Sequence, residues 1–227
     1  MIPSAEVKLD FKRAERIGFD EAILCQGKTV EHLTEIIASA RAHQARFLFT
    51  RLSPAQLEGL DARDRDALQY EPLSRTAYFG QPRPEAGPAR IAVLAAGTSD
   101  AHVTREIQRT LSWNGIASAL FADVGVAGLW RLMEKIDAIR AHPIAVVVAG
   151  MDAALPTVVG GLYGGVIIGV PTSTGYGVAE GGRTALHSML ASCSPGVVTL
   201  NIDNGYGAAC AAMRVLRAID PAAFSKG

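Results

Sequence analysis

Residues 91–100 have the sequence IAVLAAGTSD, in which an apolar run stops abruptly at a glycine and small polar residues. The same pattern recurs four more times before the chain ends. The loops that follow the apolar runs are residues 97–100, 124–128, 151–156, 171–177 and 203–207. Wholly apolar runs that alternate with helical patterns are typical of parallel strands covered by helices on both faces. We therefore predict an α/β fold, a three-layer flavodoxin-like sandwich with a parallel sheet.

The five loops are expected at one edge of that sheet, where open α/β sheets bind ligands. Gly97, Thr98 and Ser99 suit a phosphate, because the helix expected to begin near Ala101 has its positive dipole end there. Asp100 would repel a phosphate, so it binds a sugar hydroxyl, a metal or a cationic ring, or else caps the helix. The 203–207 loop is either a tight turn or a ligand loop. Together the loops predict a site for a phosphorylated small molecule.

Composition excludes several classes of function. Of 227 residues, 49% are hydrophobic, and 22 Lys plus Arg balance 22 Asp plus Glu, so no net field favours a nucleic acid or an anionic membrane. The three cysteines lack CxxC spacing, and the five histidines form no HxH or HExxH pattern, so neither a disulfide framework nor zinc is indicated. The charged N-terminus lacks an apolar signal region, and the apolar runs are shorter than the ~20 residues of a membrane span. We expect a cytoplasmic protein with no membrane partner.

The chain is predicted to divide into a small N-terminal α/β domain (1–80), a proline-containing linker (81–89) and the main domain (90–227). Within the first, residues 21–25 and 46–50 are expected to be strands flanking a helix over 30–44, which Thr29 caps. The domain also holds cations that are either solvated or bind a phosphate or carboxylate: Arg13, Arg16, Lys28, Arg51 and Arg75.

Two familiar nucleotide motifs are missing. The 171–177 loop, PTSTGYG, lacks the GxxxxGK[ST] pattern, and no GxGxxG follows the first strand of the main domain. Cys193, in the polar turn ASCSPG, is either a nucleophile or a small packing residue. His187, alone on a helix, is either a proton relay or structural.

Several strings, taken in order, are more specific than any single loop. These are AGTSD, DVGVAGLWRL, VVVAGMDAALPTVVGGL, GVPTSTGYG, SCSPGV and NIDNGYGA, with ERIGFDEAILCQGKT and LSRTA upstream. They resemble the LarB family, the pyridinium-3,5-biscarboxylic acid mononucleotide synthases of nickel-pincer cofactor biosynthesis. The C-terminal part is also similar to the aminoimidazole ribonucleotide carboxylase of purine biosynthesis, whose GSxSD signature is echoed by residues 97–100.

The resemblance implies carboxylation of nicotinic acid adenine dinucleotide at C5 of its pyridinium ring, with CO2 or bicarbonate as co-substrate. Cleavage of the phosphoanhydride then releases AMP, and neither biotin nor ATP is implied. Cys193 occupies the position of the family's cysteine that adds to the ring. Asp152 stands where the family's MEGALP string has its basic glutamate, and Ala153 replaces the following glycine.

Aspartate is one methylene shorter, and proton transfer requires about 2.6–3.2 Å between heavy atoms. Either the pocket is narrower, so that the shorter side chain still reaches the ring, or the substrate is another pyridinium or azole nucleotide. A non-catalytic nucleotide-binding regulator is the third reading. A second departure from the family is His102, which contacts a ligand phosphate or caps the helix.

The candidate site therefore has three groups of residues. The catalytic residues are Cys193 and Asp152. Asp100, Asp123 and Asp203 position the sugar, the ring or Mg²⁺, with Asp100 and Asp203 as the metal ligands, since Mg²⁺ would neutralise charge at the anhydride. The other substrate-binding candidates are Gly97, Thr98, Ser99, Gly125, Gly128, Gly150, Met151, Ala154, Leu155, Pro171, Ser173, Gly175, Tyr176, Asn204 and Gly205.

Cys193 follows the helix expected over 182–192, so it belongs at the sheet edge opposite the five loops. The related ribonucleotide carboxylases are octamers with sites at subunit interfaces. We therefore expect a homo-oligomer, an octamer by resemblance, in which a Cys193 turn approaches the loops of a neighbouring chain.

Overall fold

The computed structural model describes residues 7–221. The chain divides into two compact units, Met1–Pro84 and Glu85–Gly227. The division falls inside the proline-containing stretch 81–89. Each unit has its own sheet and its own core.

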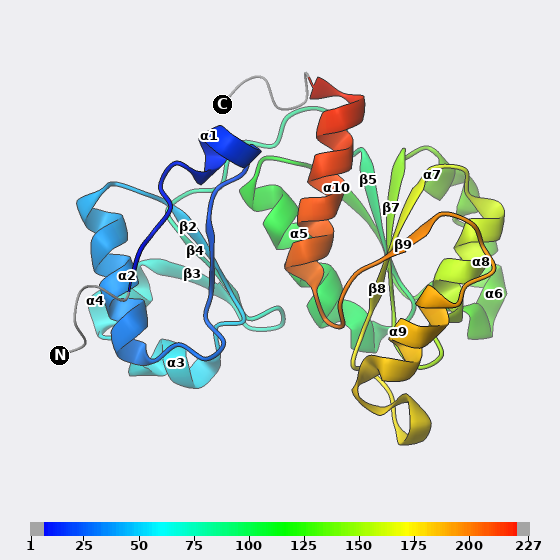
Figure 1. The fold of residues 1–227 in the computed structure, drawn as a ribbon, viewed down its shortest axis with the longest axis horizontal. Coiled ribbons are helices and arrows are strands. Elements are labelled where there is room, and N and C mark those ends of the chain that lie inside the picture. The colour runs from blue at the N-terminus through cyan, green and yellow to red at the C-terminus, as the bar shows by residue number, and fades with distance from the viewer. Residues whose placement is uncertain (1–6, 222–227) are drawn as a thin grey trace. The chain divides into compact units, whose positions relative to one another are not determined.

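The N-terminal unit contains a four-stranded sheet of order β1-β2-β4-β3. Strand β1 pairs with β2 in parallel, and the other two pairings are antiparallel. Its elements are α1 (Arg13–Ile17), β1 (Ala22–Leu24), α2 (Val30–Ala42), β2 (Phe47–Thr50), α3 (Pro54–Gly59), α4 (Ala62–Asp66), β3 (Leu68–Glu71) and β4 (Thr76–Phe79). Figure 1 shows α2 running alongside this sheet.

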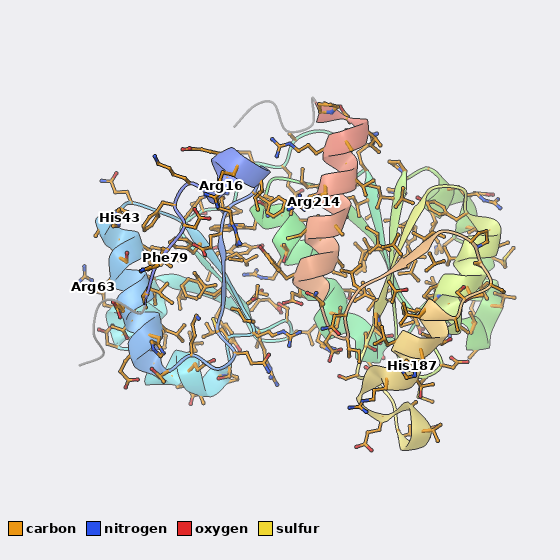
Figure 2. All side chains as sticks on the ribbon, in the orientation of Figure 1. Arg16, His43, Arg63, Phe79, His187 and Arg214 are labelled. Carbon is orange, nitrogen blue, oxygen red and sulfur yellow. The ribbon has the colours of Figure 1, made fainter. Side chains whose placement is uncertain are left out.

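Helix α2 packs because its apolar residues repeat at helical spacing. Leu33, Ile36, Ile37 and Ala40 are buried in the core of this unit. The predicted Thr29 cap is confirmed: its hydroxyl accepts a hydrogen bond from the backbone N–H of His32. Figure 2 shows the charged and aromatic side chains of this unit, including Phe79, whose ring lies 5.8 Å from the Arg41 guanidinium carbon.

The second unit contains a five-stranded, all-parallel sheet of order β6-β5-β7-β8-β9. Numbered within the unit, this is the 2-1-3-4-5 order of flavodoxin-like folds. Its strands are β5 (Ile91–Ala95), β6 (Ser118–Phe121), β7 (Ile144–Ala149), β8 (Val166–Pro171) and β9 (Val197–Thr199). Every residue of β5 and β7 is buried, as uninterrupted apolar runs predict. The predicted fold class is confirmed.

Helices cover both faces of this sheet (Figure 1). Helices α5 (Ala101–Trp113) and α10 (Gly205–Ile219) pack together on one face. The other face carries α6 (Leu129–Met133), α7 (Ile136–Arg140), α8 (Ala154–Leu162) and α9 (Arg183–Leu190). Short 3₁₀ segments η1 (Thr98–Asp100), η2 (Val126–Gly128) and η3 (Gly177–Gly182) lie in the loops. Within residues 7–221, no helix is both long and apolar enough to span a membrane.

One helix differs from expectation. The spacing of Leu129, Leu132, Ile136 and Ile139 predicts continuous stacking, but the structure divides this stretch into α6 and α7. A turn at Glu134 and Lys135 interrupts the helix, while Leu132, Ile136 and Ile139 all remain buried. Leu129, by contrast, is 46% exposed, so the apolar pattern predicts the burial of three of these four side chains and not the continuity of the backbone.

Candidate active site

Asp100 links two strand-end loops across the middle of the sheet. One oxygen, Oδ2, accepts a hydrogen bond from Gly97 N at 2.9 Å, and the other, Oδ1, accepts one from Thr172 Oγ1 at 2.7 Å. Asp100 is the N-cap residue of α5, yet its side chain caps none of that helix's N–H groups. Burial to 3% exposure raises the pKa of Asp100, and the two hydrogen bonds oppose this rise.

A second link joins the loops after β5 and β8 to the loop before α10. Asp203 Oδ1 accepts a hydrogen bond from Ser173 N at 2.8 Å and faces His102 Nε2 at 3.7 Å. His102 Nδ1 lies 3.1 Å from Ser99 O. The Asp203 carboxylate raises the pKa of His102; burial opposes ionisation of Asp203, but His102 and Ser173 hold its pKa at about 2.

These loops also approach one another at their backbones. A Cβ atom on Gly150 would lie 2.3 Å from Thr174 O, and one on Gly125 would lie 2.5 Å from Ala96 O. Neither position admits a side chain in the present arrangement. Met151 N donates to Thr174 O at 2.8 Å, so the loops after β7 and β8 are directly joined.

Backbone strain is concentrated in the same place. Asp123, Met151, Ala153 and Asp203 have φ between 49° and 56°, in the left-handed region that non-glycine residues seldom adopt. Such conformations persist only where the surrounding structure holds them, and they are common at binding sites.

The Asp123 carboxylate lies beside a cation. Arg131 Nη1 on α6 donates to Asp123 Oδ2. Gly128 is close to the same guanidinium, because its Cβ would lie 2.8 Å from Arg131 Nε. Sequence reasoning missed Arg131, since no motif connects it to Asp123. It also missed Thr172, although this hydroxyl comes directly after the proline that ends β8.

Asp152 is exposed in the loop that precedes α8. Its Oδ1 accepts a hydrogen bond from Ala154 N at 3.4 Å, next to the start of the helix. Asp152 therefore lies at the same sheet edge as Asp100 and Asp203, because all three follow the carboxyl ends of parallel strands.

Cys193 is an exposed, free cysteine in the turn between α9 and β9. The turn is held against α8, where Thr157 Oγ1 lies 2.7 Å from Ser192 Oγ and Thr157 O accepts from Ser194 Oγ at 2.6 Å. Because the turn precedes β9, it lies at the amino ends of the strands. Within one chain, Cys193 and the strand-end loops are thus at opposite edges of the sheet.

Among the other predicted residues, some have structural roles and others are simply exposed. Asn204 Oδ1 accepts from Gly207 N at 2.8 Å and so caps α10. A Cβ on Gly205 would lie 2.6 Å from Glu106 Oε2, so this glycine permits α10 to approach α5. Leu155 is buried in the core, whereas Tyr176 is 77% exposed. His187, labelled in Figure 2, is exposed on α9.

Two family models match this chain. A LarB/PurE-like N-terminal domain model matches residues 4–81, and an AIR carboxylase model matches residues 90–226. The chain belongs to the LarB family. An uncharacterized protein of Methanocaldococcus jannaschii is 32% identical to it over 209 residues, which cover 89% of this chain and 80% of that protein. The two matching family models support a carboxylase-type role for this chain.

The two carboxylates predicted to bind Mg²⁺ already accept hydrogen bonds within the protein. Both oxygens of Asp100 already accept hydrogen bonds from the protein, and Asp203 Oδ1 is engaged by Ser173 and His102. Among the residues described, no three His, Cys, Asp or Glu side chains are grouped to hold a metal ion. Each hydrogen bond uses one acceptor position of a carboxylate oxygen, so Asp100 and Asp203 stay predicted Mg²⁺ ligands. We assign no step of the reaction to a metal.

Proposed function

We propose that this chain carboxylates the pyridinium ring of nicotinic acid adenine dinucleotide at C5 and hydrolyses the phosphoanhydride. The products are AMP and pyridinium-3,5-biscarboxylic acid mononucleotide. The observation that carries the proposal is the single cluster that Asp100, His102, Thr172 and Asp203 form at the carboxyl ends of the strands in a LarB-family chain. This edge is where open α/β sheets bind their ligands.

The carboxylation requires a nucleophile, because a cationic pyridinium ring does not itself attack CO2. In the proposed first step, the Cys193 thiolate forms a C–S bond to the ring carbon next to C5, which gives a neutral enamine. C5 of that enamine then forms a C–C bond to CO2. Asp152 takes the C5 proton, and the C–S electrons leave with the thiolate, which restores the aromatic ring. Water then cleaves one P–O bond of the anhydride to release AMP.

The remaining cluster residues hold the substrate rather than react with it. Thr98 and Ser99 belong to the 3₁₀ turn η1 that leads into α5, and this position favours a phosphate. The Asp100–Thr172 and Asp203–Ser173 hydrogen bonds fix the loops on either side of it. Preorganised loops spare the cost of ordering them when the substrate binds.

The proposal includes a homo-oligomer, with a Cys193 turn from one chain at the strand-end loops of another. The opposite positions of Cys193 and Asp152 within one chain support it. Exposed apolar side chains on the second unit also support burial against another copy, and they include Trp130, Tyr176, Val178, Leu190 and Val198.

The test is mass spectrometry of products after incubation with nicotinic acid adenine dinucleotide and ¹³C-bicarbonate. We expect AMP together with a mononucleotide that is heavier by one labelled carboxyl group. Cys193→Ala should abolish both products, whereas the control Cys210→Ala, at a partly buried cysteine on α10, should form them. Full activity of Cys193→Ala would refute the covalent step.

A second candidate is the same reaction type on a different pyridinium or azole nucleotide. The observation that favours it is Asp152 itself, which is shorter than the family's glutamate and whose carboxylate binds Ala154 N at 3.4 Å. Under this candidate, Asp152→Glu restores carboxylation of nicotinic acid adenine dinucleotide to a protein that otherwise lacks it. No gain from Asp152→Glu would count against it.

A further inference from the structure

The N-terminal unit contains a cavity of about 510 Å³ whose lining includes three cationic side chains, those of Lys8, Arg13 and Lys28. Lys8, Arg13, Lys28 and His32 contribute to its lining, with Glu21 as the single acid. Ligand pockets for small molecules occupy about 300–1,000 Å³. The cavity therefore has the size of a small-molecule site and a surplus of positive charge.

The cavity lies at the start of a βαβ unit. Strand β1 ends at Leu24, helix α2 begins at Val30, and β1 and β2 are parallel. Gly27 and Lys28, in the connecting loop, both line the cavity. In this arrangement the N-terminal end of α2, a helix of 13 residues, adds a partial positive charge at the cavity.

The loop between β1 and α2 is held in one shape. Lys28 N donates to Cys25 O at 2.9 Å, and Gly27 has φ of 80°, a conformation that side chains disfavour. Gln56 Nε2, on α3, donates to Cys25 O at 2.8 Å and to Lys28 O at 2.7 Å. Two backbone carbonyls of the loop are thus held by a side chain from another helix, which fixes the backbone of the loop at Lys28 before any ligand binds.

The remaining lining of the cavity is largely apolar. Val7, Leu9, Ile23, Leu24 and Ile36 line it. An inorganic anion would contact only the cationic residues, whereas a ligand with a phosphate and a flat ring system would contact both the cationic and the apolar residues.

We propose that this cavity, whose lining residues all belong to the N-terminal unit, binds a phosphate monoester of nucleoside monophosphate size. Lys28, Arg13 and Lys8 bind the phosphate, and the aliphatic side chains contact the base. This proposal does not depend on the carboxylation reaction.

The test is calorimetric titration of the full-length protein with AMP, adenosine and inorganic phosphate. We expect AMP to bind, and Lys28→Glu to weaken that binding at least tenfold, because hydrogen bonds to charged groups are worth more than neutral ones. Lys12→Glu, at an exposed lysine outside the cavity lining, is the matched control and should bind as the wild type does. Arg13→Gln should also weaken binding, and the thermal unfolding midpoint shows whether each variant is folded.

Binding of AMP at the strand-end loops would survive Lys28→Glu, so the expected result is the loss of one binding event while carboxylation of the substrate is unchanged. The proposal is overturned if wild type binds no AMP, or if Lys28→Glu binds it as tightly as Lys12→Glu. Equal affinity for adenosine would exclude the phosphate contact, and equal affinity for inorganic phosphate would exclude the nucleoside part.

Discussion

His102 on α5 faces Asp203 in the loop before α10, so the pKa of His102 depends on whether these two segments are in contact. Asp203 raises the pKa of His102, so removing its charge should lower that pKa toward the ordinary value of about 6.5. We predict that Asp203→Asn shifts the NMR titration of the His102 ring to lower pH. An unmoved His102 titration would show that the pair is not formed in solution.

The same pair has a pH-dependent effect on stability. Because the folded-state pKa of His102 is raised, its stabilisation is complete below the unfolded pKa and is lost as pH rises through the folded value. The pKa of Asp203 is about 2, so its charge persists through that range. The difference in free energy of unfolding between wild type and His102→Gln should therefore shrink as the pH rises above the unfolded value of about 6.5 and through the raised folded value. With 39% of the His102 side chain exposed, the change is at most about 0.5 kcal/mol.

Thr172 provides the buried partner of Asp100. Replacing its hydroxyl in Thr172→Val leaves Asp100 Oδ1 without that donor, and an unpaired buried acceptor costs about 1–3 kcal/mol. We predict a loss of that size in the free energy of unfolding, measured with urea. Thr174→Val is the control, because its hydroxyl donates in an exposed position at 3.3 Å and should cost less than about 0.5 kcal/mol. Similar losses in both variants would contradict the role given to Thr172.

For single residues, the sequence predicts where Asp100 and Asp203 lie but not which side chains they contact. Asp100 and Asp203 follow apolar runs, so their place at the strand ends is visible in the pattern. Thr172 is 72 residues from Asp100, and nothing local to either residue indicates that they meet. The contact depends on β5 and β8 lying on either side of β7, which is a property of the folded sheet.

Among the elements of the second unit, strands were predicted better than helices, whereas β3 and β4 of the N-terminal unit were not predicted. Each apolar run of the second unit is a strand. The inner strands β5 and β7 are buried on both faces and so are apolar throughout, whereas the edge strands β6 and β9 are partly exposed. Helical spacing, by contrast, fixes only which side chains face the core. For this reason it marked Leu132, Ile136 and Ile139 as buried and did not reveal the turn that separates α6 from α7.

Helix α8 carries two adjacent glycines that test its contact with the Cys193 turn. A Cβ on Gly160 would lie 2.6 Å from the Cβ of Ser194, whereas one on Gly161 meets nothing within 4 Å. We predict that Gly160→Ala destabilises the protein by about 1–3 kcal/mol through overpacking. Gly161→Ala should be neutral or stabilise by up to about 1 kcal/mol, because alanine favours helix.

The Gly160→Ala and Gly161→Ala variants should also differ in enzymatic activity. Ser194 follows Cys193 directly, so a shift of Ser194 should also displace Cys193. Under conditions where both variants are folded, Gly160→Ala should therefore form the carboxylated product more slowly than Gly161→Ala does. Urea unfolding and the product assay give the two measurements. Equal stability and equal turnover in the two variants would show that the turn is not seated on α8.

For the whole molecule, the decisive question is whether one chain can supply a complete site. The sequence order alone predicts opposite edges for Cys193 and the loops. The parallel register of β8 and β9 places the Cys193 turn before β9 and the loops after the other strands.

If two chains share each site, Cys193→Ala and Asp152→Asn are each inactive alone. Co-expressed, they should recover about a quarter of wild-type activity, because that fraction of randomly assembled interfaces joins an intact cysteine to an intact aspartate. Solution mass should show an oligomer in every preparation. If both residues of a site came from one chain, the mixed protein would stay inactive, since no chain in it carries both.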